Sequence, residues 1–160
     1  MPEILEFDLN GNSYAVDISY TREIVESLPI TPIPRTPEYI AGMTNIRGEI
    51  TTLISLAMII GQKAVPVSPS HKFIILVSEA AKGDKIGLIV DEVHSVYSVP
   101  DSSIEYKTDG PSASRKSFIK GIIRLEEEKT GIGERKGTHK LILYLDIEKV
   151  LSHIFDLAKR

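Results

Sequence analysis

The chain has 160 residues, 42% of them hydrophobic and 26% charged, with a formal net charge of −3 and no cysteine. This composition fits a globular protein of one domain or two small lobes, and it excludes thiolate nucleophiles, disulfides and cysteine metal sites. The net charge argues against a broadly basic surface for nucleic acid. Because we find neither a membrane-span-length apolar run nor a signal-peptide pattern, we expect a cytoplasmic protein.

The N-terminal segment predicts a β-hairpin. Leu5, Phe7 and Leu9 alternate with charged residues, which is the two-residue period of a strand. Asn10-Gly11 then supplies the dipeptide that tolerates positive φ in a tight turn, and a second alternating run ends at Ile18. Residues 19–25 predict a turn or short helix that leads into a strand around 23–25.

A proline-rich segment follows, with four prolines between residues 29 and 37. Proline cannot donate to a sheet ladder, so this segment cannot be a central strand and should form a stiff connector. Thr36 and Pro37 have the residue types of a helix start, and we expect a short helix that ends by Gly42. Residues 49–60 read as an apolar strand with a continuation to Gly61.

The rest of the chain alternates between apolar runs and polar connections. Asp146 is a candidate N-cap for a final amphipathic helix. Short strands at this spacing predict an all-β barrel or sandwich, built as one unit or as two lobes. The predicted order is a linker at 62–70, strands at 73–77 and 85–93 with extended chain to 100, a loop at 101–117, a strand at 121–128, an exposed turn at 127–137 and a buried strand at 140–146.

Few residues point to catalysis or to a cofactor. The four histidines show no i, i+4 pair for a metal, which leaves only a pairing in space. No GxSxG elbow is present, and the glycine-rich run 131–137 lacks the GxGxxG pattern and its strand–helix context. The basic cluster Arg115–Lys120 is small for a nucleic-acid surface. We therefore expect no enzyme activity, no metal and no cofactor.

Two charged residues remain as candidates for a binding site, Glu23 in TREIV and Arg47 in NIRGEI. In one interpretation they are surface charges, bonded to each other or to Glu49. In the other, a charge beside an apolar strand forms a binding patch, because the planar guanidinium holds a carboxylate or carbonyl in a fixed geometry. The residue pattern alone leaves both open.

Nearly the whole chain, from about residue 4 to 155, resembles the CheW-like family of chemotaxis adaptor domains. The similar segments are, in order, FDLNGNSYAVDI, REIV, ITPIPRTPEYIAGMTNIRGEI, KIGLIVDEV and KLILYLDIEKVL. The most specific of them is the PxxPxxIxGxxNIRG pattern within the third. The resemblance implies two SH3-like five-stranded β-barrel lobes on a shared core, with lobe 1 at about 14–65 and lobe 2 at about 66–145. The N-terminal strand and a C-terminal helix at 146–158 would bridge the lobes.

The resemblance also implies a non-catalytic scaffold without a cofactor. Family members bridge the cytoplasmic helical tip of chemoreceptors to the regulatory domain of a CheA-type histidine kinase, so receptor arrays would recruit the protein without direct membrane insertion. Two alternatives stay open: a same-fold adaptor for a non-chemotaxis receptor or kinase pathway, and a small β-barrel that binds RNA or single-stranded DNA.

The resemblance further implies two sets of site residues. Those matching the receptor-facing groove are Glu23, Arg47 and Ile74, with Thr21 in place of an apolar residue. Those matching the kinase-facing edge are Ile30, Thr31, Ile33 and Gly42. The sequence departs from the family after NIRG, where Thr52, Ser55 and Ala57 stand in place of a proline, an aspartate and an arginine.

Overall fold

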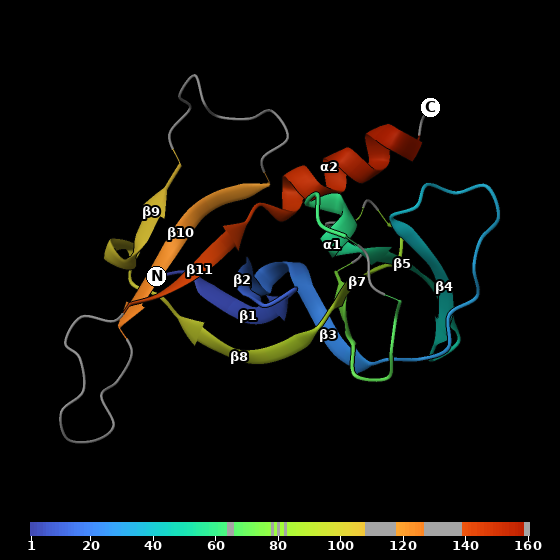
Figure 1. Ribbon diagram of the computed structural model, residues 1–160, viewed down its shortest axis with the longest axis horizontal. Coiled ribbons are helices and arrows are strands. Elements are labelled where there is room, and N and C mark those ends of the chain that lie inside the picture. The colour runs from blue at the N-terminus through green and yellow to red at the C-terminus, as the bar shows by residue number, and fades with distance from the viewer. Residues whose placement is uncertain are drawn as a thin grey trace.

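The computed structural model describes residues 1–63, 66–77, 79, 81, 83–107, 118–126 and 139–158. These residues are mostly β-strand, arranged in two sheets that lie side by side, with α2 across their junction (Figure 1). The all-β prediction is therefore confirmed. The predicted turn at 127–137 lies outside the described residues, as does most of the predicted loop at 101–117.

The first sheet has six strands in the order β8-β1-β2-β11-β10-β9. Its members are β8 (Glu92–Ser98), β1 (Glu3–Leu9), β2 (Asn12–Asp17), β11 (His139–Leu145), β10 (Ile119–Glu126) and β9 (Ile104–Tyr106). All neighbours pair antiparallel except β11 and β2, which are parallel. This parallel pair brings the two ends of the chain together in one sheet.

The second sheet has five strands in the order β3-β6-β7-β5-β4. Its members are β3 (Thr21–Glu26), β6 (Lys72–Leu76), β7 (Ile86–Val90), β5 (Glu49–Ser55) and β4 (Ile40–Ile46). The only helices longer than one 3₁₀ turn among the described residues are α1 (Leu56–Ile59) and α2 (Ile147–Ala158). The 3₁₀ turns are η1 (Ile18–Tyr20) and η2 (Asp101–Ser103).

The division into lobes differs from the expected one. The five-stranded sheet takes β6 and β7, which lie beyond residue 65, whereas the six-stranded sheet combines β1 and β2 with β8–β11. The boundaries 14–65 and 66–145 are therefore wrong as a division of the sheets. Strand pairing across long sequence separations decides which segments share a sheet, and the linker at 62–70 connects two parts of one sheet.

Predictions of local structure were confirmed where the residue types of a turn or the hydrophobic period gave a clear signal. The β1–β2 hairpin turns at Asn10 (φ 48°) and Gly11 (φ 85°), as the dipeptide predicted. The helix expected from Thr36 to Gly42 is wrong: the chain turns there without helix, and Thr36 Oγ1 donates to the Ile33 carbonyl instead of capping a helix. A short strand that was not predicted, β9, lies inside the region expected to be a loop.

The departures after NIRG lie in β5 and α1. Ser55 caps α1, because its hydroxyl accepts a hydrogen bond from the Met58 N–H at 3.4 Å. A serine in this place therefore still provides a side-chain acceptor for a helix start. Thr52 lies half-buried in β5, and Ala57 is buried in α1.

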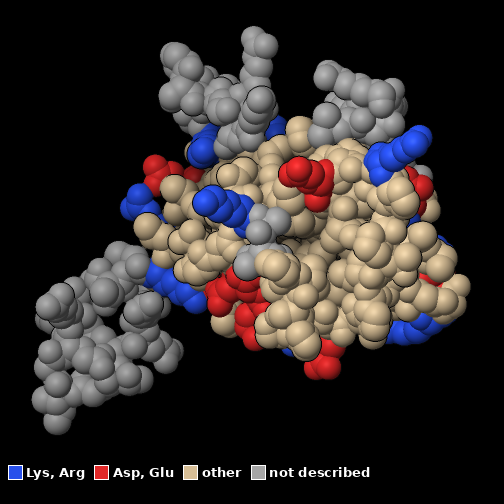
Figure 2. All heavy atoms as spheres, turned by 45° about the vertical axis from the view of Figure 1, so that its right-hand side comes forward, with Lys and Arg blue, Asp and Glu red and all other residues tan. Residues whose placement is uncertain are grey.

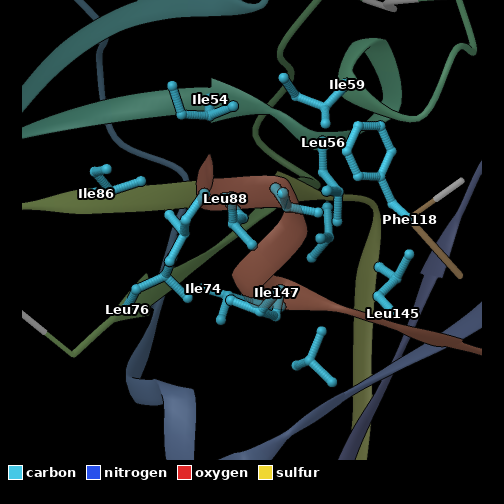
Figure 3. Packing of buried hydrophobic residues seen from close by; sticks show 14 of the residues in the cluster. Ile54, Leu56, Ile59, Ile74, Leu76, Ile86, Leu88, Phe118, Leu145 and Ile147 are labelled. Carbon is cyan, nitrogen blue, oxygen red and sulfur yellow. The ribbon is translucent and has the colours of Figure 1, made fainter. Parts of the chain in front are cut away.

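A shared apolar core joins the two sheets (Figure 3). It draws on Leu5 and Phe7 of β1, Ile74 of β6, Leu88 of β7 and the buried face of α2. The Asp146 carboxylate accepts from the Lys149 N–H at 3.2 Å, so the predicted cap of α2 is confirmed. Each sheet also has a smaller apolar cluster of its own. No helix of the described residues is long and apolar enough to cross a membrane.

Candidate functional site

Arg47 occupies a strained position in the tight turn between β4 and β5. Arg47 and Gly48 both have positive φ, 51° and 82°, which is the pattern of a two-residue type I′ hairpin turn. The Asn45 side-chain oxygen accepts the Gly48 N–H at 2.8 Å and closes the turn. The sequence NIRG therefore forms a hairpin tip that projects one arginine.

Arg47 reaches from this tip to Glu23 on β3, and the two side chains form an ion pair. The Arg47 side chain is 70% exposed, whereas that of Glu23 is only 19% exposed. Glu23 is thus held at the sheet while the guanidinium lies in solvent. Of the two bonds that the sequence left open, the one between these residues is present.

Glu49 belongs to a neighbouring charge cluster. Its carboxylate binds Lys85 at 2.8 Å and Arg22 at 3.4 Å. The hydrogen bond and charge of Lys85 hold the pKa of Glu49 below its usual value. Because all three side chains are substantially exposed, water screens these pairs, and we expect them to contribute little to folding.

The other two receptor-facing candidates, Thr21 and Ile74, make their contacts within the fold. Thr21 is half-buried at the start of β3, and its hydroxyl donates to the Ile18 carbonyl at 2.8 Å. Ile74 is 0% exposed and belongs to the shared core. Direct contact between Ile74 and a partner is therefore excluded in this conformation, because the sheet and core cover it. Its cross-strand neighbour Ile24 is 41% exposed.

The proline segment is attached to β4 at the kinase-facing candidates. Thr31 and Met43 exchange backbone hydrogen bonds of 2.8 and 2.9 Å, and Thr44 Oγ1 donates to the Pro29 carbonyl at 2.8 Å. Gly42 makes this approach possible: a Cβ there would lie 2.3 Å from the Thr31 oxygen. Gly42 itself is buried, so it can act only by letting the segment approach, and a direct contact with a partner is excluded.

The remaining members of this edge are accessible. Thr31 is exposed, and Ile30 and Ile33 are half-buried. An open groove of about 410 Å³ lies beside Ile30 and is lined by residues 27–30 and 67–69. The edge therefore offers apolar side chains on a segment that hydrogen bonds fix to the sheet.

The side of the molecule that carries the proline segment and β4 has few charged residues. Between residues 27 and 46 the only charged side chains are Arg35 and Glu38. Figure 2, which turns the side of the five-stranded sheet forward, shows a wide uncharged surface with charged side chains mainly near its borders. Such a surface is typical of protein interfaces, whose centres are depleted in charge.

The six-stranded sheet contains a buried charged residue, Glu6, whose burial was not predicted from the sequence. Glu6 is 4% exposed and is bound by Tyr97 at 2.6 Å and by Lys140. Burial raises the pKa of Glu6, but the hydrogen bonds from Lys140 and Tyr97 outweigh it, so the pKa lies below the ordinary 4.5. The alternation in β1 placed Glu6 opposite the core residues, yet gave no sign that this second face is also covered.

A second network of this kind surrounds Asp17. Its carboxylate accepts from the buried Tyr144 hydroxyl and binds Lys120 at 2.8 Å. Burial and the Asp17 hydrogen bond raise the pKa of Tyr144. Lys120, one cation of the predicted basic cluster, is therefore engaged within the fold.

One group of possible metal ligands occurs in the described part of the chain. Ligand atoms of Glu6, Asp8 and His94 lie within 4.8 Å of one another, a grouping in space that the sequence could not reveal. His94 binds Asp8 at 2.8 Å, and the Lys140 ammonium binds Glu6. Because that ammonium already neutralises Glu6, the arrangement favours an ion-pair network over a metal centre.

Taken together, the fold and these surfaces define a two-lobed β protein with an exposed arginine on a hairpin tip and an apolar, proline-braced edge. A scan against protein families matches the CheW-like domain over residues 3–155. The chain therefore belongs to the CheW-like domain family.

Individual relatives agree with this assignment. The chain is 31% identical over 124 residues to chemotaxis protein CheW of Rhizobium meliloti, covering 78% of each chain. It is 25% identical over 152 residues to chemotaxis protein CheW of Thermotoga maritima, covering 95% of this chain and 89% of that one. The crystal structure of the scaffolding protein TtCheW from Thermoanaerobacter tengcongensis has a TM-score of 0.68 and 32% identity, covering 91% of this chain and 89% of that chain.

Proposed function

We propose that this protein is a non-catalytic scaffold that couples the cytoplasmic tips of chemoreceptors to a CheA-type histidine kinase. Family membership and the resemblance to a scaffolding protein support an adaptor role in chemotaxis. The observation that carries the proposal is the exposed Arg47 guanidinium, anchored by Glu23 at the edge of a charge-poor surface. Recruitment to receptor arrays would follow from binding the receptor.

The receptor-facing surface is the Glu23–Arg47 pair with its surroundings. A guanidinium presents several N–H donors in a rigid plane, so it can bind Glu23 and still offer donors to a second acceptor. Thr21 and the exposed Ile24 lie on the same strand as Glu23, and Ile74 supports that strand from the core. The charge would orient the receptor helices, and apolar contacts would supply buried area.

The kinase-facing surface is the edge formed by Ile30, Thr31 and Ile33, which Gly42 allows to approach β4. Prolines and backbone hydrogen bonds fix this edge before binding, so little conformational entropy is lost when a partner docks. The two surfaces use different parts of the five-stranded sheet, which would allow both partners to bind together.

Arg47→Ala tests the receptor surface. We expect it to lower the affinity for a receptor cytoplasmic fragment by about tenfold or more and to leave kinase affinity unchanged. Arg124→Ala is the matched control, because Arg124 forms an exposed ion pair with Glu105 on the other sheet. Titration of both variants with the fragment and with the kinase regulatory domain measures these affinities. Equal loss of both partners in Arg47→Ala would show that the surfaces overlap.

Ile33→Asp tests the kinase surface. We expect a weaker complex with the kinase regulatory domain and unchanged receptor affinity, because a charge replaces an apolar contact on one edge only. Isothermal titration measures both affinities, and thermal unfolding checks the fold. If kinase affinity stays at the wild-type value, the edge is wrongly assigned. If the variant unfolds, Ile33 serves the core instead of a partner.

A further inference from the structure

We infer that Asn45 is a positioning residue that holds Arg47 in a left-handed backbone conformation and so aims its guanidinium at the receptor. The inference rests on the proposed receptor surface. It assigns a role to Asn45. It also explains why the hairpin tip contains an arginine, although arginine is unfavourable at this position of the turn.

The turn geometry is unusual for an arginine. At φ 51° the Cβ of an L-residue crowds its own backbone, and type I′ turns accordingly favour Asn-Gly, Asp-Gly or Gly-Gly. Asn10-Gly11 in the β1–β2 hairpin follows this preference, with φ 48° and 85°. The two hairpins thus have almost the same backbone, and only the second has arginine in the first turn position.

Packing does not account for the arginine. Its side chain is 70% exposed, and within the described chain its charged contact is the ion pair with Glu23. Gly48, beside it, has open space around it. We therefore assign the role of this exposed, strained residue to the contacts of its guanidinium, because strained backbone is concentrated at functional sites.

Asn45 stabilises the backbone at this point. Its Oδ1 accepts the Gly48 N–H at 2.8 Å, a bond that closes the chain around Arg47. Asn45 is exposed and lies opposite Ile50, which is 57% exposed, so its side chain contributes little to the core. Asn45 thus fixes the backbone of the tip, while Glu23 fixes the head group of Arg47. The remaining N–H donors then face solvent in a fixed direction and suit a carboxylate or carbonyl oxygen of the partner.

The first experiment needs no partner. In the full-length protein, ¹⁵N relaxation of the Gly48 amide and the Arg47 Nε reports the order of the tip. We expect Asn45→Ala to lower both order parameters and Asn45→Asp, which keeps an acceptor oxygen, to restore them. Arg47→Asn should leave the melting temperature unchanged or raise it by up to about 4 °C, because asparagine suits the turn better. Unchanged order in Asn45→Ala would overturn the inference.

The second experiment titrates the same variants with a soluble helical hairpin that spans the cytoplasmic tip of a chemoreceptor from the same genome. We expect Asn45→Ala to weaken binding about three- to tenfold, Asn45→Asp to recover it, and Arg47→Asn to lose tenfold or more. If Arg47→Asn binds like the wild type, the proposed receptor surface fails. If Arg47→Asn loses binding but Asn45→Ala does not, that surface stands and the positioning role of Asn45 is wrong.

Discussion

The two sheets of this protein treat charge in opposite ways. In the six-stranded sheet, Glu6 is buried and Asp17 is partly buried, and each is paired with a lysine and a tyrosine. In the five-stranded sheet, the buried polar residues Thr44 and Thr51 are uncharged, and each ion pair of Glu23 and Glu49 has a partner that is at least 40% exposed. One sheet uses charge within its fold, and the other displays charge at the rim of an uncharged surface.

This difference implies that the charges of the two sheets have different roles, one in stability and the other in binding. A partly buried charge that loses its partner keeps its desolvation cost, so its removal destabilises the fold. An exposed pair gains little, because water and salt screen it. We therefore expect substitutions of charged and hydroxyl groups to affect folding through the six-stranded sheet and binding through the five-stranded one.

The largest effect should come from Gly42, which tests whether the five-stranded sheet depends on backbone contact instead of charge. Gly42→Val places a Cβ 2.3 Å from the Thr31 oxygen in a backbone with φ 147°. We expect the free energy of unfolding to fall by about 3 kcal/mol, measured by urea denaturation, and kinase affinity to fall with it. Gly83→Val is the control: Gly83 also has a positive φ, but a Cβ there would meet open space. It therefore measures the cost of backbone strain without a steric clash. An equal loss in both variants would contradict the role of the Thr31 contact.

Tyr144→Phe tests the contribution of the Asp17 network in the six-stranded sheet to stability. The hydroxyl is buried and donates to Asp17, so its loss should cost about 2 kcal/mol of unfolding free energy. Tyr106→Phe is the control, since Tyr106 lies on the same sheet and is half exposed. Chemical denaturation compares the two variants. Similar stabilities would mean that the Asp17 network adds nothing to the fold.

Glu6→Gln sharpens the comparison through pH. The pKa of Glu6 is lower in the folded protein than the ordinary 4.5, so the unfolded chain binds the proton more readily. The stabilisation is therefore present above about pH 4.5 and is lost as pH falls through the folded-state pKa. Between pH 6 and pH 3 we expect the variant to lose less stability than the wild type. Thermal unfolding at each pH measures this loss. Parallel curves would contradict this.

Arg22→Ala should have the smallest effect. Arg22 and Glu49 are both substantially exposed and lie 3.4 Å apart, so their pair should contribute no more than about 0.5 kcal/mol. The melting temperature should move by no more than about 2 °C, and this difference should vanish at high salt. A shift as large as that of Tyr144→Phe would show that the outward charges also support the fold.

Much of the local structure could be predicted from particular residues. Asn10-Gly11 predicted its hairpin because few other dipeptides accept two positive φ values. Asp146 and the apolar period after it predicted α2. The prediction from Thr36 and Pro37 failed for a non-local reason: Thr31 pairs with β4, which continues the five-stranded sheet where a helix was expected. The short β9 was missed because its pairing with β10 outweighs a weak local pattern.

For the candidate site, the sequence by itself determined which residue types stand where: an arginine before a glycine, a glutamate on a strand, and prolines along a connector. Only the tertiary structure decided that Glu23 meets Arg47, that Ile74 is covered, that Gly42 lies under Thr31 and that Glu6 is buried. Turns and caps depend on residues a few positions apart, so their chemistry is visible in the sequence. Ion pairing, burial and sheet membership depend on segments tens of residues apart, which only the folded chain brings together.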